Sequence, residues 1–321
     1  TSENPDTTTR TVSFVVNDGT INSAGSTQTV SVAAVNDAPL VATSGGTTAF
    51  TEGNGVPSVP LAVDAAITVM DLDSAALASA SVSITGGFQA AEDMLAFVND
   101  AATMGNITAS YNAATGVLTL ASAGATATQA QWQAALRAVT YLNTSENPDT
   151  TTRTVSFVVN DATSNSTASN KDVSVTGQND APVVTATAGT TAFIEGSNTA
   201  STPVAVDTGV TVSDLDNATL AGATVSITGG FQAAEDMLAF VNDAATMGNI
   251  TASYNAATGV LTLASAGATA TQAQWQAALR AVTYLNTSEN PDTTTRTVSF
   301  VVNDGTINSA GSTQTVSVAA V

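Results

Sequence analysis

The sequence of 321 residues has no cysteine and no histidine, and only 10% of its residues are charged, against about 25% in an average soluble domain. The chain therefore lacks the thiol nucleophile, disulfides, the commonest general base and the commonest zinc ligands. These absences exclude most familiar enzyme classes. The donors that remain are carboxylate and amide oxygens, which suit hard cations such as Ca²⁺.

Basic residues are also scarce, because six lysines and arginines accompany 26 acidic residues and the formal net charge is −20. A chain this acidic offers no basic groove to a phosphate backbone, so we predict no nucleic-acid partner. No apolar run reaches the roughly 18 residues of a membrane span, and no signal segment opens the sequence. We expect a soluble segment, internal to a longer protein, with no membrane insertion.

The sequence repeats with a period of 143 residues. The segment TSENPDTTTRTVSFVVND begins at Thr1, Thr144 and Thr287. Residues 82–161 recur without a change as residues 225–304, so 80 consecutive positions are shared, surface residues included. Identity of this extent indicates a recent duplication of one module.

The tetrapeptide Asn-Asp-Ala-Pro, at 36–39 and 179–182, marks the boundaries between modules, because proline fixes φ and disfavours helix in the preceding residue. We predict three parts: the C-terminal part of a preceding repeat over 1–37, and whole repeats over 38–180 and 181–321. A tail of 37 residues cannot bury a core of its own. It either hangs loose or pairs along an exposed sheet edge, in its own chain or in a neighbouring molecule.

Most of each repeat has the period-2 alternation of half-buried strands. Examples are Val155, Phe157 and Val159 in TVSFVVND, Val225 and Ile227 in ATVSITGG, and Ile250, Ala252 and Tyr254 in ITASYN. The loop at 255–259 contains glycine and suits a hairpin. One segment differs, because Trp132, Leu136 and Val139 follow Thr128 at the spacing of one helical face. We predict an all-β antiparallel sandwich of eight or nine strands, with one short helix per repeat.

Acidic residues recur beside turn signals, and the Asp-Leu-Asp at 71–73 and 214–216 follows its linker by the same distance each time. On an extended segment, alternate positions place both carboxylates on one face, within reach of one cation. The alternative is that Asp and Asn at strand ends form Asx-turns and caps. For Asp161 and Asp304, a role as ligand and a role in a turn are equally supported.

The order of these features resembles cadherin-like tandem domains: an acidic residue in the first strand, an Asp-x-Asp some tens of residues later, and an Asn-Asp-x-Pro linker. The detailed sequence is similar to the Ig-like and cadherin-like repeats of large RTX-type bacterial surface adhesins. The stretches that carry this resemblance are VSDLDNATLAGATVSITGGFQAAEDML, ITASYNAATGVLTLAS and RAVTYLNTSENPDTTTRTVSFVVNDG. The glycine-rich RTX nonapeptide itself is absent. The linker also lacks the Asp before, and the second Asn after, the Asn-Asp of cadherins, which implies fewer ligands.

The resemblance implies Ca²⁺ between consecutive domains, held by the linker, by the Asp-x-Asp of the following domain and by acidic residues of the preceding one. At the second junction it implies Asn179, Asp180, Asp214 and Asp216, with Glu52 and with Glu92 or Asp93 as further donors. At the first junction it implies Asn36, Asp37, Asp71 and Asp73. Glu195 is the counterpart of Glu52 in the second whole repeat.

We therefore expect a structural spacer of a secreted bacterial cell-surface adhesin, stiffened by calcium, whose partners are adjacent repeats of its own chain. Two alternatives stay open: an extracellular filament or surface layer assembled by homotypic strand exchange, and a calcium-dependent glycan-binding module. We predict no enzyme, since the adjacent carboxylates Glu92 and Asp93 face opposite sides of a strand and cannot flank one glycosidic bond. The spacing of Trp132 and Trp275 favours core packing over an exposed sugar platform.

Overall fold

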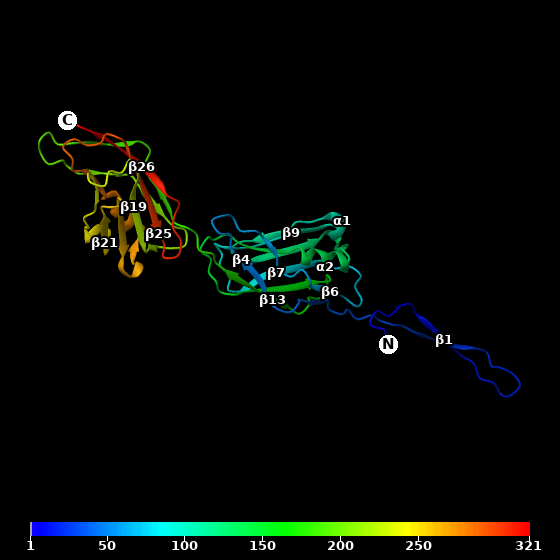
Figure 1. Cartoon of the computed structure of the whole chain (residues 1–321). Coiled ribbons are helices and arrows are strands. Elements are labelled where there is room, and N and C mark those ends of the chain that lie inside the picture. Colours follow the sequence, from blue (N-terminus) through cyan, green and yellow to red (C-terminus); the bar gives the residue numbers. More distant parts are fainter. Residues whose placement is uncertain (1) are drawn as a thin grey trace. The chain divides into compact units, whose positions relative to one another are not determined.

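The structure is a computed structural model, and it describes residues 2–321 (Figure 1). The chain forms two compact units, of which unit 1 ends at Gln178 and unit 2 runs from Asn179 to Val321. Each unit has its own hydrophobic core of buried aliphatic and aromatic side chains. Each can therefore be described as a separate packed body.

After the N-terminal tail, the described part of unit 1 contains eleven strands and two short α-helices. The strands are β3 (Leu40–Ala42), β4 (Thr48–Thr51), β5 (Leu61–Ala62), β6 (Thr68–Met70), β7 (Ser79–Gly86), β8 (Asp93–Ala96), β9 (Ile107–Asn112), β10 (Val117–Ser122), β11 (Thr140–Asn143), β12 (Arg153–Asn160) and β13 (Ser169–Thr176). The helices are α1 (Ala101–Met104), α2 (Gln129–Arg137) and the 3₁₀ turn η1 (Ala123–Ala125).

These strands form the two layers of a sandwich. One sheet has the order β4-β13-β12-β7-β10-β9 and the other has the order β5-β11-β8, with a separate pair β3-β6. The pairs in unit 1 are antiparallel except β4 with β13. Side chains on β7 alternate between buried and partly buried, so one face of the large sheet covers the core. The all-β antiparallel sandwich is confirmed, with more and shorter strands than the eight or nine expected.

The predicted helix is present as α2. Thr128 caps it: its Oγ1 accepts from the Gln131 N–H, and the Gln131 side chain accepts from the Thr128 N–H. Trp132 is fully buried, and its Nε1 donates to the Leu77 carbonyl oxygen at 2.9 Å. Trp132 and Trp275 are therefore core residues, and neither is a sugar platform. The one-turn helix α1, capped by Asp100, was not expected from the sequence.

Unit 2 repeats this arrangement. Its strands are β14 (Val183–Thr185), β15 (Thr190–Ile194), β16 (Val204–Ala205), β17 (Thr211–Ser213), β18 (Thr219–Leu220), β19 (Gly222–Gly229), β20 (Asp236–Ala239), β21 (Ile250–Asn255), β22 (Val260–Ser265), β23 (Ala270–Thr271), β24 (Thr283–Asn286), β25 (Arg296–Asn303) and β26 (Ser312–Ala319). Its helices are α3 (Ala244–Met247), α4 (Gln272–Arg280) and the 3₁₀ turn η2 (Ala266–Ala268). The large sheet has the order β15-β26-β25-β19-β22-β21 and the small sheet β16-β24-β20, beside the pairs β14-β17 and β18-β23.

The expected hairpin joins β21 to β22. The Gly259 N–H donates to the Asn255 carbonyl oxygen at 2.9 Å, and Gly259 has φ +68°, which glycine adopts without strain. The predicted alternation is incomplete on β21, because Ile250 is buried but Ala252 is exposed. β21 is the edge strand of its sheet, and Ile250 near its start and the partly buried Tyr254 near its end pack against the core, whereas Ala252 between them does not.

The N-terminal tail forms a hairpin of its own, β1 (Arg10–Phe14) with β2 (Ser26–Val30), which extends away from the rest of unit 1 in Figure 1. Each residue of both strands is exposed. Phe14 is 58% exposed, whereas its counterparts Phe157 and Phe300 are fully buried. In the described chain the tail therefore pairs with itself and with no other sheet edge.

Candidate functional site

The candidate ligands divide into two groups at opposite ends of each unit. In unit 1, β13 starts after the loop that holds Asp161 and ends just before Gln178, where the chain leaves the unit. Strand β4 runs parallel to β13, so Glu52, directly after β4, lies at the end where the chain leaves. We name the residues at the other end, Asn36, Asp37, Asp71, Asp73 and Asp161, the entry group.

Hydrogen bonds hold the entry group of unit 1 together. The Asn36 side-chain amide donates to Asp161 Oδ2 at 2.8 Å, and the Asp37 N–H donates to Asp73 Oδ2 at 3.0 Å. Gln129, at the start of α2, donates from Nε2 to the Asp71 carbonyl oxygen at 2.8 Å. The linker, the Asp-Leu-Asp and the loop before β13 thus converge, and the structure brings Asn36, Asp37, Asp71 and Asp73 together.

The Asp-Leu-Asp is not an extended segment, which corrects the geometry assumed from the sequence. It follows β6 as a bend, and Asp71 Oδ1 accepts the N–H groups of Asp73 at 3.1 Å and Ser74 at 2.8 Å. Asp71 is therefore the first residue of an Asx-turn. Its second oxygen, Oδ2, is buried and has no hydrogen-bond partner. The turn and the ligand role are compatible, because each uses a different oxygen.

Unit 2 has an equivalent entry group, formed by Asn179, Asp180, Asp214, Asp216 and Asp304. The Asn179 side chain donates to Asp304 Oδ2 at 2.6 Å, and the Asp180 N–H donates to Asp216 Oδ2. Asn217 Nδ2 donates to Asn179 Oδ1 at 3.0 Å and so fixes the orientation of the Asn179 amide. The structure brings together the four predicted residues of this junction that belong to unit 2.

The environment of Asp304 lowers its pKa. Burial by itself raises the pKa of Asp304, but hydrogen bonds from Asn179, Ile307 and Thr306 outweigh burial and lower the pKa to about 2. The pKa of Asp161 is lowered in the same way, against burial, by Ser164, Asn36 and Thr163. Both carboxylates form turns through Oδ1 and accept a hydrogen bond from the linker Asn through Oδ2, so the turn role is present in both units.

A second group, which we name the exit group, lies where the chain leaves unit 1. Glu52 is 3% exposed, its N–H donates to the Thr176 carbonyl oxygen at 3.0 Å, and its Oε2 accepts the Gln178 N–H at 2.6 Å. Glu52 and Glu146 each place one carboxylate oxygen within 4.8 Å of the other. Glu146 was not expected from the sequence, although its Ser-Glu-Asn-Pro context recurs in all three copies.

The exit group of unit 2 consists of Glu195 and Glu289, which occupy the sequence positions of Glu52 and Glu146. Glu195 is 5% exposed, and its N–H donates to the Ala319 carbonyl oxygen at 3.0 Å. Each unit thus has one acidic group at each end, and within a unit the two groups do not meet.

Several oxygens in both kinds of group are buried and lack a hydrogen-bond partner within the chain: Asp71 Oδ2, Asp73 Oδ1, Glu146 Oε2, Glu195 Oε2 and Asp214 Oδ2. A buried carboxylate oxygen without a partner is costly, and native structures contain few of them. The negative charge of Asp71 is also disfavoured, since burial and the neighbouring Asp73 raise the pKa of Asp71. A hard divalent cation would satisfy these oxygens.

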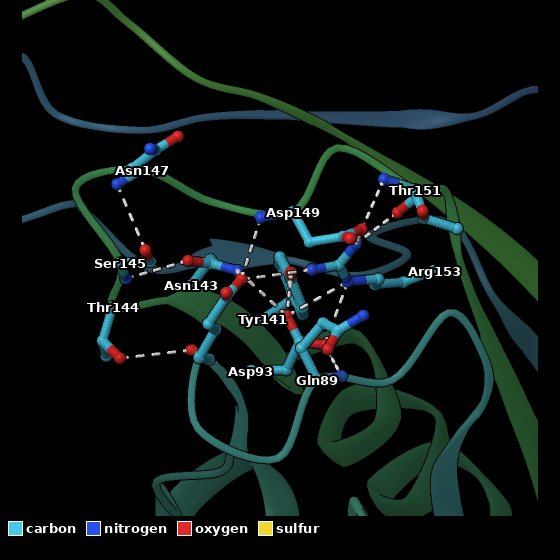
Figure 2. A network of polar contacts seen from close by, with 11 residues as sticks. Gln89, Asp93, Tyr141, Asn143, Thr144, Ser145, Asn147, Asp149, Thr151 and Arg153 are labelled. Carbon is cyan, nitrogen blue, oxygen red and sulfur yellow. Dashed lines mark hydrogen bonds and ion pairs between the residues drawn. The ribbon is translucent and has the colours of Figure 1, made fainter. Parts of the chain in front are cut away.

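Glu92 and Asp93 belong to a separate network inside the sandwich, shown for unit 1 in Figure 2. Arg153, fully buried on β12, donates from Nε to Asp93 Oδ2 at 2.9 Å. Asp93 also accepts from Tyr141 Oη at 2.6 Å, from Asn143 Nδ2 at 3.1 Å and from the Gln89 N–H at 2.8 Å. Arg153 reaches Glu92 at 3.6 Å as well.

This network excludes Asp93 as a calcium ligand, which corrects that expectation. Its oxygens already accept hydrogen bonds inside the sandwich, so none is left for a cation. Glu92 and Asp93 both pair with Arg153, so this carboxylate pair is part of the structure and not a catalytic pair. Burial, and then the Asp93 carboxylate, raise the pKa of Tyr141, so Tyr141 stays protonated and donates.

The chain was compared with family models, with curated proteins and with solved structures. No family model matches the chain. Halomucin of Haloquadratum walsbyi is 36% identical over 130 residues, which are 40% of this chain and 1% of that protein. The chain thus spans a very small part of the curated relative that it matches.

Several solved structures match almost the whole chain, at low TM-scores. Domains EC1–3 of mouse clustered protocadherin PcdhgC3 are 13% identical, with a TM-score of 0.33, over 98% of this chain and 76% of that chain. Domains EC21–23 of human CDH23 are 14% identical, with a TM-score of 0.30, over 97% and 74%. Domains 4–9 of the surface layer protein SbsC are 11% identical, with a TM-score of 0.25, over 97% and 35%. Within residues 2–321, no helix is long and apolar enough to cross a membrane.

Proposed function

We propose that this chain is part of the structural extender region of a secreted, RTX-type bacterial surface adhesin. Its repeats act as rigid spacers, joined by linkers that Ca²⁺ stiffens, and they project an adhesive domain located elsewhere in the protein. The observation that carries the proposal is the set of buried carboxylate oxygens without hydrogen-bond partners at both ends of the repeat. A fold that needed these carboxylates only for turns would leave their second oxygens exposed to water.

In this proposal the entry group of one repeat and the exit group of the preceding repeat supply ligands to the same cation. At the second junction the donors are Asn179, Asp180, Asp214 and Asp216 from unit 2, with Glu52 and Glu146 from unit 1. At the first junction the donors of unit 1 are Asn36, Asp37, Asp71 and Asp73. Glu195 would serve a repeat that follows. Carboxylate and amide oxygens are the donors that Ca²⁺ prefers.

The mechanism is electrostatic. Without a cation, the carboxylates that meet at a linker repel one another, so the linker bends freely. A bound cation reverses the sign of this interaction and stabilises the one arrangement in which all donors reach it. Extracellular modules bind Ca²⁺ with dissociation constants of about 10⁻⁴ to 10⁻³ M, so such sites fill outside the cell. Stiffening would therefore follow export.

Small-angle scattering tests this proposal on the whole chain, first with Ca²⁺ and then with a chelator. We expect a larger maximum dimension and a stiffer particle with Ca²⁺. The double variant Asp214→Asn and Asp216→Asn should scatter alike in both conditions. Asp172→Asn, which removes an exposed carboxylate on β13 outside both groups, is the matched control and should respond like the parent chain. A parent profile that Ca²⁺ does not change would refute the proposal, and a concentration series would detect strand exchange between chains.

A further inference from the structure

The loop that follows Glu52 contains the only Asn-Gly step of the sequence, Asn54-Gly55. This loop connects β4 to β5 and turns tightly, since a Cβ on Gly53 would collide with the Val56 carbonyl oxygen. Asn54 and Gly55 are both exposed, and Gly55 has φ +58°. The step therefore lies in contact with solvent, two residues after a carboxylate of the exit group.

An asparagine that precedes glycine can lose its side-chain amide without an enzyme. The backbone nitrogen of the next residue attacks the side-chain carbonyl carbon, and the new C–N bond closes a succinimide ring. The amide nitrogen leaves as ammonia and takes the proton of the attacking N–H. Water then opens the ring at either carbonyl and leaves an aspartate or an isoaspartate, whose acid proton passes to solvent. The reaction therefore needs an attacking N–H that is not engaged elsewhere, and a following residue that leaves room for the attack.

Gly55 meets both conditions. It has no side chain, and within residues 2–321 its N–H donates no hydrogen bond. The linker asparagines differ, because the fold already uses the next N–H in each linker. The N–H after Asn36 donates to Asp73 Oδ2 at 3.0 Å, and the N–H after Asn179 donates to Asp216 Oδ2.

The Asn-Ser steps, which also have a small following residue, are protected in the same way. They begin at Asn22, Asn165 and Asn308. In each step the serine N–H donates to a carbonyl oxygen at 2.7 or 2.8 Å. Sequence and hydrogen bonding therefore both distinguish Asn54 from these asparagines.

Unit 2 has no Asn-Gly step in the equivalent loop. Ser197 and Asn198 stand where unit 1 has Asn54-Gly55, and Asn198 has φ +51°. Asn198 is exposed too, but the next residue is the β-branched Thr199, whose N–H donates to a carbonyl oxygen of the same turn at 3.4 Å. The loop of unit 2 should therefore keep its amide, which makes it an internal control.

We propose that Asn54 is a site of spontaneous deamidation, and that the carboxylate formed there is added to Glu52 and Glu146 in the exit group of unit 1. The exit group of unit 2 gains no such charge. The use of the new carboxylate rests on the proposed extender function, whereas the modification itself does not. Because the number of charged ligands tunes Ca²⁺ affinity, the junction after unit 1 would bind the ion more tightly as the protein ages.

Mass spectrometry of the whole folded chain, incubated with a chelator at mildly alkaline pH, tests the modification. Peptides that contain residue 54 should gain the mass difference between an amide and an acid, and peptides that contain Asn198 should not. A synthetic peptide of residues 50–60 gives the rate without the fold. We expect the folded chain to react within about tenfold of this rate, since mobile loops open at almost no cost in free energy. A residue 54 that keeps its amide while the peptide loses it would overturn the proposal.

Two exchanges taken from unit 2 sharpen this test. Gly55→Asn introduces the residue that has a similar φ in unit 2, so the variant should fold, and its side chain should slow the loss of ammonia from Asn54 strongly. The double variant Ser197→Asn with Asn198→Gly transfers the step to unit 2 and should make position 197 react. Equal rates at residue 54 in the parent chain and in Gly55→Asn would contradict the assigned mechanism.

Calcium titration tests the use of the new charge. Asn54→Asp reproduces one of the two products, and it should bind Ca²⁺ roughly threefold more tightly than fresh parent chain, because a further negative charge attracts a divalent ion even through water. Gln28→Glu adds the same charge to the exposed tail hairpin and should leave the affinity unchanged. An affinity that Asn54→Asp does not change would overturn the role in the exit group. A parent chain that binds no Ca²⁺ would refute the proposed function and this role together, and the mass measurement decides the deamidation in either case.

Discussion

Replacing Asp93 with asparagine should destabilise unit 1 strongly, because it removes the closest and only fully buried carboxylate partner of Arg153, at 2.9 Å, and leaves the partly exposed Glu92 at 3.6 Å and Asp149 at 3.3 Å. Asparagine has nearly the same shape and can still accept from Tyr141, so the change removes charge and little else. The pair is completely buried, since both side chains are 0% exposed. Breaking a buried pair by removing one partner costs about 3 to 5 kcal/mol. That is a large part of the roughly 5 to 15 kcal/mol that stabilises a typical domain.

Thermal unfolding measures this loss, and each kcal/mol lowers the midpoint by roughly 2 to 4 °C for a domain of this size. We therefore expect the transition of unit 1 to fall by roughly 6 to 20 °C, with the transition of unit 2 unchanged. The chain has two tryptophans, Trp132 in unit 1 and Trp275 in unit 2. Fluorescence in a Trp275→Phe background thus reports unit 1 alone, and Trp132→Phe reports unit 2.

Unit 2 provides a matched replicate, because Arg296 Nε lies 2.8 Å from Asp236 Oδ2 and both side chains are 0% exposed. Asp236→Asn should lower the second transition by the same amount. The double variant Asp93→Asn with Arg153→Met should recover much of the stability, since it removes the unpaired charge. A loss below about 1 kcal/mol in both single variants would match an exposed ion pair and refute this account of the network.

Three further predictions concern unit 1. Ala162 has φ +88°, and the residue at the same place in unit 2 is Gly305 with φ +111°. Because glycine adopts a positive φ without strain, Ala162→Gly should stabilise unit 1 by about 1 kcal/mol and Gly305→Ala should destabilise unit 2. The separate melting transitions of the two units measure both changes. Thr128→Ala removes the capping box of α2 and should cost about 1 kcal/mol in urea unfolding; Thr126→Ala, which leaves the cap intact, is its control. Burial raises the pKa of Asp64, but hydrogen bonds from Ser44 and Ala66 and the charge of Lys171 outweigh burial and lower this pKa below its ordinary value. Asp64 therefore stabilises unit 1 above its unfolded pKa, and this contribution is lost as pH falls through the folded pKa. Lys171→Gln should raise that folded pKa and move the acid transition of unit 1 to higher pH; an unmoved transition would contradict it.

The sequence was most informative where one local interaction decides the structure. Thr128 and the Trp132 spacing predicted α2 because a cap and an apolar face suffice to define a short helix. The Asx-turn at Asp71 was not decided in advance, because Asp-Leu-Asp is equally compatible with an extended segment and a bend. The bend is also contacted by Gln129, 58 residues later in the sequence, which donates to the Asp71 carbonyl oxygen. Glu146 was missed for a similar reason, since only the fold brings it near Glu52.

The segment TSENPDTTTRTVSFVVND occurs three times in one chain. Comparing the three copies shows which features of this segment depend on its local sequence and which depend on its tertiary contacts. In each copy the following strand pairs with it in the same register: Arg10↔Val30, Arg153↔Val173 and Arg296↔Val316. The hairpin therefore follows from local sequence alone. Burial does not, because Phe14 is 58% exposed and Phe157 and Phe300 are fully buried. Those two become buried because β7 and β19 pair with β12 and β25 and complete the sheet over the core. Period-2 patterning thus identifies which face a strand can bury, and only the partner strands decide whether it is buried.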